Sequence, residues 1–548
     1  MAEEAEGFSN SRSGGSPAER PNSALPSEPW RPKFNPWLIG VVVAMAAFME
    51  VLDTSIANVA LPYMAGNLGA SNDESTWVLT SYLVSNAIVL PISGWLAAAF
   101  GRKRFFMTCL IIFTISSLLC GFAPSLGAII FFRVLQGAGG GGLQPMSQAI
   151  LADVFPPQQR GQAFALYGIT TIIAPTIGPT LGGWITDNYS WRWIFFINLP
   201  VGILALFLVY RLVDDPPWAK KRAAGAGVKI DYIGVALLTL GVGALQIMLD
   251  KGQEDDWFGS QFILTLAVIA VVGLVSLVIW EWFYKHPIIE VRLFKNLNFL
   301  GANAMMFVLG IMLFSSLVMM PLFLQTLMGY TASSAGLVLS GGGLLLLFEM
   351  PVVGVLVSKI QARYMIAFGW LALSLAMFYS TQHLDLDISF RFASILRMVQ
   401  VCGLAFLFVP INLVSYVGMP AEKSNSVAGL VNFMRNIGSS IGTSMVTTLI
   451  ARRAQFHQVY LVRHTAPGQP TFTQAVKALA AHLAVMGLDA SRATSQAYGR
   501  VYRALIGQAT TLAYIDTFWV LCVGAGIMFL LSFALRKNQP GGRAEAAL

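Results

Sequence analysis

Charged residues and cysteines are scarce in this chain. Only 11% of the 548 residues are Asp, Glu, Lys or Arg, whereas a soluble globular protein carries about 25%. All four cysteines lie inside apolar runs, which argues against a disulfide framework. A soluble globular domain and a disulfide-rich secreted domain are therefore both disfavoured.

The sequence signatures of enzymes are missing as well. There is no GxxxxGK[ST] loop and no HExxH motif, so ATP-driven transport and metalloprotease chemistry are disfavoured. The letters of a dinucleotide fingerprint at 137–142 and of a nucleophile elbow at 438–442 fall within apolar runs, where neither motif works. The five histidines lie in loops or near the ends of such runs. We predict no enzymatic activity, no metal and no cofactor.

Apolar sequence is what the chain has in abundance. Hydrophobic residues make up 56% of it, and its mean hydropathy is +0.65. A helix needs ~20 apolar residues to cross a hydrocarbon core of ~30 Å, and helices are expected because lipid offers no hydrogen-bond partner to an open backbone. The fourteen predicted spans are 37–62, 77–98, 105–123, 126–151, 161–186, 193–213, 231–250, 261–283, 299–327, 334–358, 364–381, 392–418, 425–450 and 508–535.

Basic residues predict the orientation of these spans. Fifteen Lys and Arg fall in the short loops on one side, and only Arg192, Lys251 and Arg391 fall in the short loops on the other. The positive-inside rule then puts both termini in the cytoplasm. The isoelectric point near 9.3 follows from this bias, so it does not indicate nucleic-acid binding.

Three polar segments lie outside the spans. Residues 1–36 are rich in Ser, Pro, Gly and Glu, so we expect a disordered cytoplasmic tail and no signal peptide. Residues 536–548 are similar. The outer loop 452–507 contains two amphipathic stretches, 472–487 and 491–507, and the first has an apolar stripe at helical spacing: Val476, Leu479, Leu483 and Met486. Such a stripe has to be covered, either by the protein itself, as a lid, or by a partner.

An internal repeat relates the two ends of the chain. Arg-Val-Leu-Gln at 133–136 is echoed by Arg-Met-Val-Gln at 397–400, and the Pro-x-x-Gly segment 91–105 is echoed by 351–365 at a nearly equal spacing. Parallel repeats of this kind are typical of transporters that rock around a central site. The repeat predicts two six-helix halves, 37–213 and 299–535, around an extra pair of spans within 214–298.

Four ionisable residues lie deep inside predicted spans: Glu50, Asp53, Arg133 and Glu349. A bare charge at the bilayer centre costs roughly 3 kcal/mol or more, so it indicates a functional cavity or a structural ion pair between helices. Glu50 and Asp53 share one helical face, and at ~1.5 Å per residue Arg133 lies at a similar depth. An arginine favours the charged form of a carboxylate and apolar burial favours the neutral form. Such a site can release or take a proton.

At these residues the sequence resembles the major facilitator superfamily, and within it the fourteen-helix, EmrB-like drug:proton antiporter family. The resemblance covers nearly all of 37–535. Together the matching segments are highly specific, although each alone is weak. They are 52-LDTSIANVALP-62, 94-GWLAAAFGRKR-104, 133-RVLQGAGGGG-142, 168-GITTIIAPTIGPTLGG-183, 191-WRWIFFINLPVG-202 and 432-NFMRNIGSSIG-442.

The resemblance implies an all-α polytopic membrane protein with the major facilitator fold, fourteen transmembrane helices arranged as two six-helix halves plus an inserted helix pair. It implies a secondary transporter of the bacterial inner membrane that exports amphipathic toxic compounds or drugs as protons move inward. It also adds a periplasmic adaptor and an outer-membrane channel as partners, and for this reason we favour docking over a lid for loop 452–507. A proton-coupled importer and a non-transporting sensor or assembly subunit are the alternatives.

The resemblance and the buried charges together suggest functional residues. We expect Asp53, Arg133 and Glu50 to couple transport to protons, although Glu50 is also a candidate for contact with cationic substrate. Glu349 is a candidate for substrate contact, a proton site or a structural hydrogen bond. Arg435 either satisfies neighbouring helix groups or meets anionic substrates, and the other substrate candidates are Asn432 and Gln136.

Two motifs are expected to govern the conformational change. In the first, small residues spaced four apart permit close helix packing, and prolines favour a bend; its residues are Gly178, Pro179, Gly182 and Gly183. The second is the loop of Gly94, Gly101 and Arg102. There the family pattern has an Asp where this chain has Ala98, which argues against a charge relay in this loop.

Overall fold

The computed structural model describes residues 32–216, 230–465 and 469–535, and within these ranges the protein is all α-helical. The predicted tails therefore lie largely outside the described residues. The helices are α1 Pro36–Leu68, α2 Asn72–Phe100, α3 Arg102–Gly121, α4 Leu126–Val154, α5 Arg160–Asn188, α6 Trp193–Phe196, α7 Asn198–Leu212, α9 Tyr232–Lys251, α10 Gln261–Phe283, α11 Leu297–Thr326, α12 Ala332–Leu356, α13 Ala362–His383, α14 Phe390–Val401, α15 Leu404–Ser415, α16 Ser424–Val462, α17 Pro470–Val485 and α18 Ala490–Ser532.

Helix occurs at each of the fourteen predicted spans. Thirteen of the spans in the described ranges are long and apolar enough to cross a membrane. The remaining one is α16, whose apolar run is interrupted by Asn425, Asn432 and Arg435. The predicted span 392–418 is broken between α14 and α15, where Gly403 approaches the backbone of Gly369.

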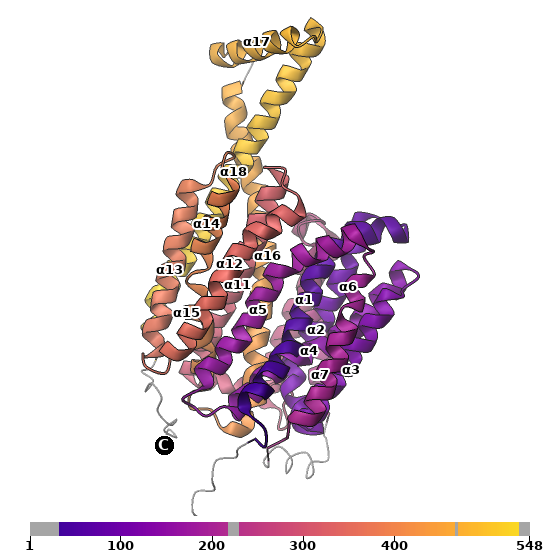
Figure 1. Ribbon diagram of the computed structural model, residues 1–548, viewed down its shortest axis with the longest axis vertical. Helices are drawn as coiled ribbons and strands as arrows, with labels where there is room; N and C mark the ends of the chain where they lie inside the picture. The colour runs from indigo at the N-terminus through magenta and orange to yellow at the C-terminus, as the bar shows by residue number, and fades with distance from the viewer. Residues whose placement is uncertain (1–31, 217–229, 466–468, 536–548) are drawn as a thin grey trace, which may run out of the picture. The chain divides into compact units, whose positions relative to one another are not determined.

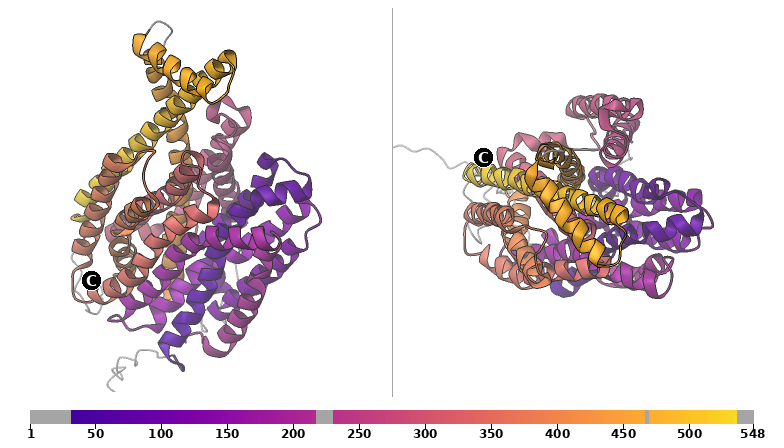
Figure 2. Two further views of the ribbon diagram at one scale, coloured as in Figure 1. Left: turned by 45° about the horizontal axis from the view of Figure 1, so that its top comes forward. Right: turned by 90° about the horizontal axis from the view of Figure 1, so that it is seen from above.

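The helices form two groups with the inserted pair beside them. In Figure 1, α1 to α7 lie on one side and α11 to α16 with α18 on the other. Helices α9 and α10 pack against each other, and α9 also contacts α2 and α16. Seen from above in Figure 2, this pair lies outside the two groups, at the edge where they meet. The described chain begins and ends at one face of the bundle, here the terminal face, and α17 lies at the opposite face, here the hairpin face (Figure 1).

The long outer loop is built from extended membrane helices. Helices α16 and α18 have 39 and 43 residues, or roughly 60 Å at ~1.5 Å per residue, about twice the hydrocarbon thickness. The predicted second amphipathic helix is thus not separate, because α18 runs unbroken from Ala490 into the last span.

The apolar stripe of α17 is covered by the chain itself. Val476 and Leu483 are buried against Ala493 and Ala497 of α18, whereas Met486 is 65% exposed. A partner is therefore not needed to cover most of this stripe. The expectation that an adaptor docks on loop 452–507 can no longer rest on an exposed apolar stripe.

Small residues let α5 pack closely between the two groups. A Cβ atom added to Gly178 would overlap the Ser55 side chain of α1, and one added to Gly182 would lie 3.0 Å from Ile56 Cγ2. On its other side α5 contacts α12, where a Cβ on Gly354 would lie 3.0 Å from Gln162 Cα. Thus α5 touches its own half and the opposite half at once.

We predict that replacing Gly178 by Ala lowers stability and that replacing Gly183 does not. Overpacking costs about 1–3 kcal/mol, which outweighs the gain of about 1 kcal/mol in helix propensity. Gly183 is the matched control, because its nearest neighbour, Val59 Cγ1, is 4.0 Å from an added Cβ. Thermal unfolding of both purified variants in detergent measures the difference. Equal midpoints would contradict close packing of α5 on α1.

Candidate functional site

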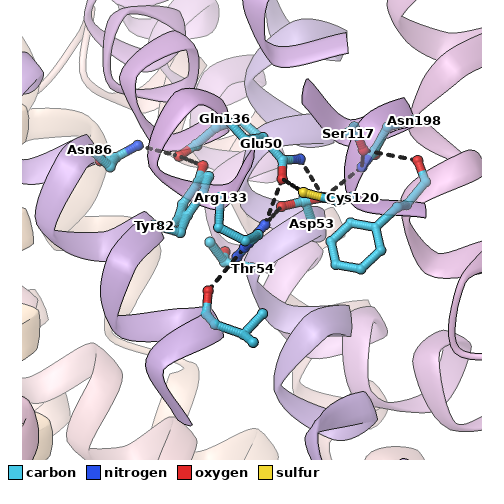
Figure 3. A network of polar contacts seen from close by, with 12 residues as sticks. Glu50, Asp53, Thr54, Tyr82, Asn86, Ser117, Cys120, Arg133, Gln136 and Asn198 are labelled. Atoms are coloured by element: carbon cyan, nitrogen blue, oxygen red, sulfur yellow. Dashed lines mark hydrogen bonds and ion pairs between the residues drawn. The ribbon is translucent and has the colours of Figure 1, made fainter. Parts of the chain in front are cut away.

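A buried ion pair joins α1 to α4. Arg133 Nη1 lies 2.6 Å from Asp53 Oδ2, and the two residues are 0% and 2% exposed (Figure 3). Arg133 Nε donates a hydrogen bond to the carbonyl oxygen of Val78 on α2 at 3.1 Å. The depth estimate that placed Asp53 and Arg133 at one level agrees with this contact.

Asp53 has two further hydrogen-bond donors. Its Oδ1 accepts from Gln136 Nε2 at 2.9 Å and from Asn198 Nδ2 at 2.6 Å. Gln136 Oε1 in turn accepts from Arg133 Nη1 at 2.9 Å, and Asn198 Nδ2 also donates to Ser117 Oγ at 3.0 Å. Gln136, a substrate candidate in the sequence, is fully buried here. It braces the ion pair.

Glu50 lies one turn away with a different set of partners. Its Oε1 accepts hydrogen bonds from Tyr82 Oη at 2.9 Å and Asn86 Nδ2 at 3.0 Å, and its Oε2 accepts from Gln144 Nε2. The ring of Tyr82 also lies 4.2 Å from the Arg133 guanidinium carbon. Tyr82 therefore touches both carboxylate clusters.

The Glu50 cluster continues into the other half of the protein. Arg435 of α16 donates to Gln144 Oε1. Tyr167 of α5 also donates to Gln144 Oε1, at 3.3 Å, and to Asn432 Oδ1 of α16, at 2.9 Å. The structure thus brings Glu50, Arg435 and Asn432, all predicted from sequence, into one polar bridge between the halves.

Glu349 stands apart from this bridge. It lies on α12 and is half-buried, and its Oε2 is buried without a hydrogen-bond partner among the described residues. Of the four intramembrane charges singled out in the sequence, it is the one that the structure does not join to the others.

The terminal face has its own link between the halves. Arg102 Nη1 lies 2.6 Å from Asp153 Oδ2 of α4, and Asp153 Oδ1 accepts a hydrogen bond from Ser424 of α16 at 3.0 Å. Gly94 packs on the backbone of Ser426, 2.8 Å from the position of an added Cβ, and Gly101 has a left-handed φ of 90°. A carboxylate therefore does pair with this loop, but it comes from Asp153 and not from the position of Ala98.

The internal repeat is visible in three dimensions. In the second half, Arg397 Nη1 donates to Ser316 Oγ of α11 at 3.2 Å and to Gln400 Oε1 at 3.4 Å. Gln400 Nε2 donates to Ser380 Oγ at 3.0 Å. These contacts repeat those of the first half, with Ser316 in the place of Asp53. Among the described residues, Arg397 has no carboxylate partner.

Sequence reasoning missed several members of these networks. Asn198 lies inside the matching segment 191–202 and Gln144 follows the glycine run of α4, so both stood next to a usable signal. No sequence signal pointed to Tyr82, Asn86 or Asp153, because single polar residues in or beside apolar runs are common and do not stand out. Within the described ranges, no group of three or more His, Cys, Asp or Glu could hold a metal ion.

Known proteins are similar to this chain in sequence and in fold. A profile of the Major Facilitator Superfamily matches residues 43–443. The multidrug export protein EmrB of Haemophilus influenzae is 39% identical over 79% of this chain and 84% of its own, and the fatty acid resistance protein FarB of Neisseria gonorrhoeae is 38% identical over 82% and 86%. The solved proton:xylose symporter XylE has a TM-score of 0.58, at 13% identity, over 92% of this chain and 96% of its own. The likeness to XylE concerns the fold alone. The chain belongs to the Major Facilitator Superfamily and is a multi-pass secondary transporter, not an enzyme.

Proposed function

We propose that this protein exports amphipathic toxic compounds or drugs across the bacterial inner membrane in exchange for protons, with both termini in the cytoplasm. The observation that carries the proposal is the buried ion pair of Asp53 with Arg133, which contains one ionisable carboxylate and lies one turn from a polar bridge between the two halves. The relatives support export, since one is a multidrug export protein and another a fatty acid resistance protein.

Asp53 is the proposed proton carrier. Its two oxygens accept three hydrogen bonds, from Arg133, Gln136 and Asn198, a set that suits a carboxylate and leaves no acceptor for an acid proton. Adding a proton therefore forces at least one of these donors to move. Because the donors come from α4 and α7, protonation changes how three helices are held together.

Tyr82 connects the proton site to the proposed substrate site. Its hydroxyl group bonds Glu50 while its ring lies under Arg133, so a shift of Arg133 disturbs the position of the Glu50 partner. Glu50 and Arg435 supply opposite charges to one bridge through Gln144. A substrate that displaces Gln144 would gain a charged partner whether it carries an amine or a carboxylate. Asn432 adds polar contacts with the substrate at this bridge. Glu349 on α12 provides a further substrate contact away from the bridge.

The two conformational motifs suit alternating access. The contacts of Arg102 with Asp153, of Asp153 with Ser424, and of Gly94 with Ser426 hold the halves together at the terminal face. Breaking these contacts would open that face. Helix α5 is placed to rock against α12, because it is held closely to α1 by Gly178 and Gly182 while also touching α12.

A periplasmic adaptor, leading to an outer-membrane channel, is the proposed partner of the hairpin face. The extended ends of α16 and α18 present exposed aromatic and apolar side chains, including Phe456, Val459, Tyr498 and Tyr502. Tyr498 contacts Phe472 of α17, with 6.0 Å between the ring centroids, yet it is still 52% exposed. The docking proposal therefore rests on these exposed side chains, not on the apolar stripe of α17.

We predict that Asp53→Asn abolishes proton-driven export without preventing membrane insertion. The amide preserves the shape of the side chain but cannot take up a proton. The measurement is substrate flux in proteoliposomes with an imposed pH gradient. Asp187→Asn, a change at an exposed carboxylate of the same type, should export normally. Full proton-coupled flux in Asp53→Asn would rule out this carboxylate as the coupling site.

We predict that Arg133→Ala lowers both stability and transport. Removing one partner of a buried ion pair costs about 3–5 kcal/mol, and Asp53 would lose its counter-charge. Arg133→Lys keeps the charge without the forked geometry, so it should recover part of the flux. Adding Asp53→Asn to Arg133→Ala should restore part of the lost stability but none of the coupling.

Unfolding midpoints and flux for the single and double variants form the test of Arg133. The double-variant cycle isolates the interaction between the two side chains. If wild type, Arg133→Lys and Arg133→Ala transported equally, Arg133 would not take part in proton coupling. Its ion pair between α1 and α4 would also not be required for transport.

For the outer segment, we predict that a short Gly/Ser linker in place of 465–505 leaves flux in proteoliposomes unchanged, because no adaptor is present there. Drug resistance in cells and crosslinking to the adaptor should be lost. The double variant Val459→Asp, Tyr502→Asp changes two exposed side chains outside the contact of α17 with α18, and it should have the same effect as the linker in cells. Equal loss in proteoliposomes and in cells would identify the segment as part of the transporter itself.

A further inference from the structure

The inserted helix pair contains a deeply buried glutamate. Glu281 lies in the last turn of α10, near the terminal face, and is 1% exposed. Neither of its carboxylate oxygens has a hydrogen bond among the described residues. The backbone N–H groups of Ile288 and Ile289 lie near the carboxylate, but their geometry falls short of a hydrogen bond. An ionised carboxylate in such a place has lost its hydration without compensation, so it has to be paired or neutralised.

The group that Glu281 faces is a second carboxylate. Asp231 is the N-cap of α9, and a Cβ atom added to Gly234 would lie 2.8 Å from both Asp231 Oδ2 and Glu281 Oε1. These two oxygens are therefore no more than twice that distance apart. Two ionised carboxylates this close repel each other strongly when water is excluded. One member of such a pair takes up a proton far more readily than an isolated carboxylate does.

The hydrogen bonds of the pair indicate which member stays charged. Asp231 Oδ1 accepts from Gly234 N at 2.8 Å and from Trp280 Nε1 at 3.1 Å, and Asp231 Oδ2 accepts from Trp280 Nε1 at 2.9 Å. Donors of this kind favour the ionised form of a carboxyl group, and Glu281 receives none from the described residues. A carboxylate oxygen can accept two hydrogen bonds, so Asp231 Oδ2 has room for one more donor.

The described basic side chains nearby are engaged elsewhere or exposed. Lys423 pairs with Glu290 at 2.6 Å, and Arg292 donates to the carbonyl oxygen of Trp282 at 2.8 Å. Lys295 lies over the ring of Trp282 at 5.0 Å. None of the ion pairs in the described ranges involves the two facing carboxylates. The exposed basic residues of the segment after α10 are Lys285 and His286.

We propose that Glu281 and Asp231 form a proton-binding site, in which the carboxyl group of Glu281 holds the proton and donates a hydrogen bond to Asp231 Oδ2. The pair then carries one negative charge, and its hydrogen bond ties the end of α10 to the start of α9. Loss of the proton leaves two like charges facing each other and loosens this tie. The site is separate from the Asp53 pair on α1 and α4, so it does not rest on the proposed export.

Infrared spectroscopy tests for the proton directly, because the carbonyl stretch of a carboxylic acid lies apart from the bands of a carboxylate. Spectra are recorded on the purified protein in phosphatidylcholine vesicles at neutral pH. Asp53→Asn serves as the background, so that the proposed proton carrier contributes no acid band. We expect Glu281→Gln to remove one acid band from the spectrum of this background.

Glu290→Gln is the matched control for this measurement. Glu290 is a carboxylate nearby that is paired with Lys423, so its replacement should remove no acid band. An acid region that Glu281→Gln leaves unchanged would show that Glu281 is ionised, and it would overturn the proposal.

A second variant tests the part that Asp231 plays. Asp231→Asn keeps an oxygen to cap α9 but removes the neighbouring charge, so Glu281 should lose its proton at a pH lower by about one unit or more. The measurement follows the acid band of Glu281 as the pH is raised, taken as the difference between spectra with and without Glu281→Gln. A titration of this band that Asp231→Asn does not move would contradict the pairing of the two carboxyl groups.

A bound sodium ion is the other way to neutralise two facing carboxylates, and thermal unfolding in detergent separates it from a proton. A proton site predicts that the unfolding midpoint of the wild type falls as the pH rises through the neutral range, because the folded state holds a proton that the unfolded state releases. Glu281→Gln should reduce this fall. A midpoint that instead rises with sodium concentration at fixed pH and ionic strength, and does so only when Glu281 is present, would overturn the proposal in favour of the ion.

Discussion

The pairing of Asp53 with Arg133 is the constraint on which the first half of the protein depends. A charge inside a bilayer has to be neutralised within the protein, because lipid supplies neither water nor counter-ion. Here α1 supplies the anion and α4 the cation, while α7 provides Asn198 and α2 the carbonyl oxygen of Val78. Four helices are thus held in register by one buried pair, in a setting where apolar contacts alone specify little.

The same scarcity of hydrogen-bond partners supports the proposal that protonation of Asp53 leads to movement. In water a protonated carboxylate finds new partners at once. In this site the nearby side chains that bond Asp53 are all donors, so a proton cannot be added without displacing one of them. In the proposed mechanism, Tyr82 passes such a displacement to Glu50, and Gln144 passes it on to α16, because these residues are joined by hydrogen bonds. This polar path crosses from α4 of the first half to α16 of the second half.

The sequence predicted the features that depend on local composition. Span length and hydropathy located every long helix, and the depths of Asp53 and Arg133 placed them at one level. Contacts between helices were beyond it, because Gln144, Asn198 and Asp153 acquire their roles only from what faces them. The extension of α18 was missed for a different reason. Residues 491–507 and 508–535 both have helical periodicity with no proline between them, so composition changes there while the helix continues.

The repeat shows which of the two matching arginine networks contains an ionisable carboxylate. Arg133 and Arg397 occupy matching positions. Each bonds the glutamine three residues further along the chain, and each also bonds a side chain of the first helix in its half. The arginine side chain is not deprotonated in proteins. The partner in the first half is Asp53 and in the second Ser316, which does not ionise in this range. A proton can therefore change the charge of this constellation in the first half only. In the proposed mechanism, the Arg397 network of the second half does not take up a proton, and the first half moves against it.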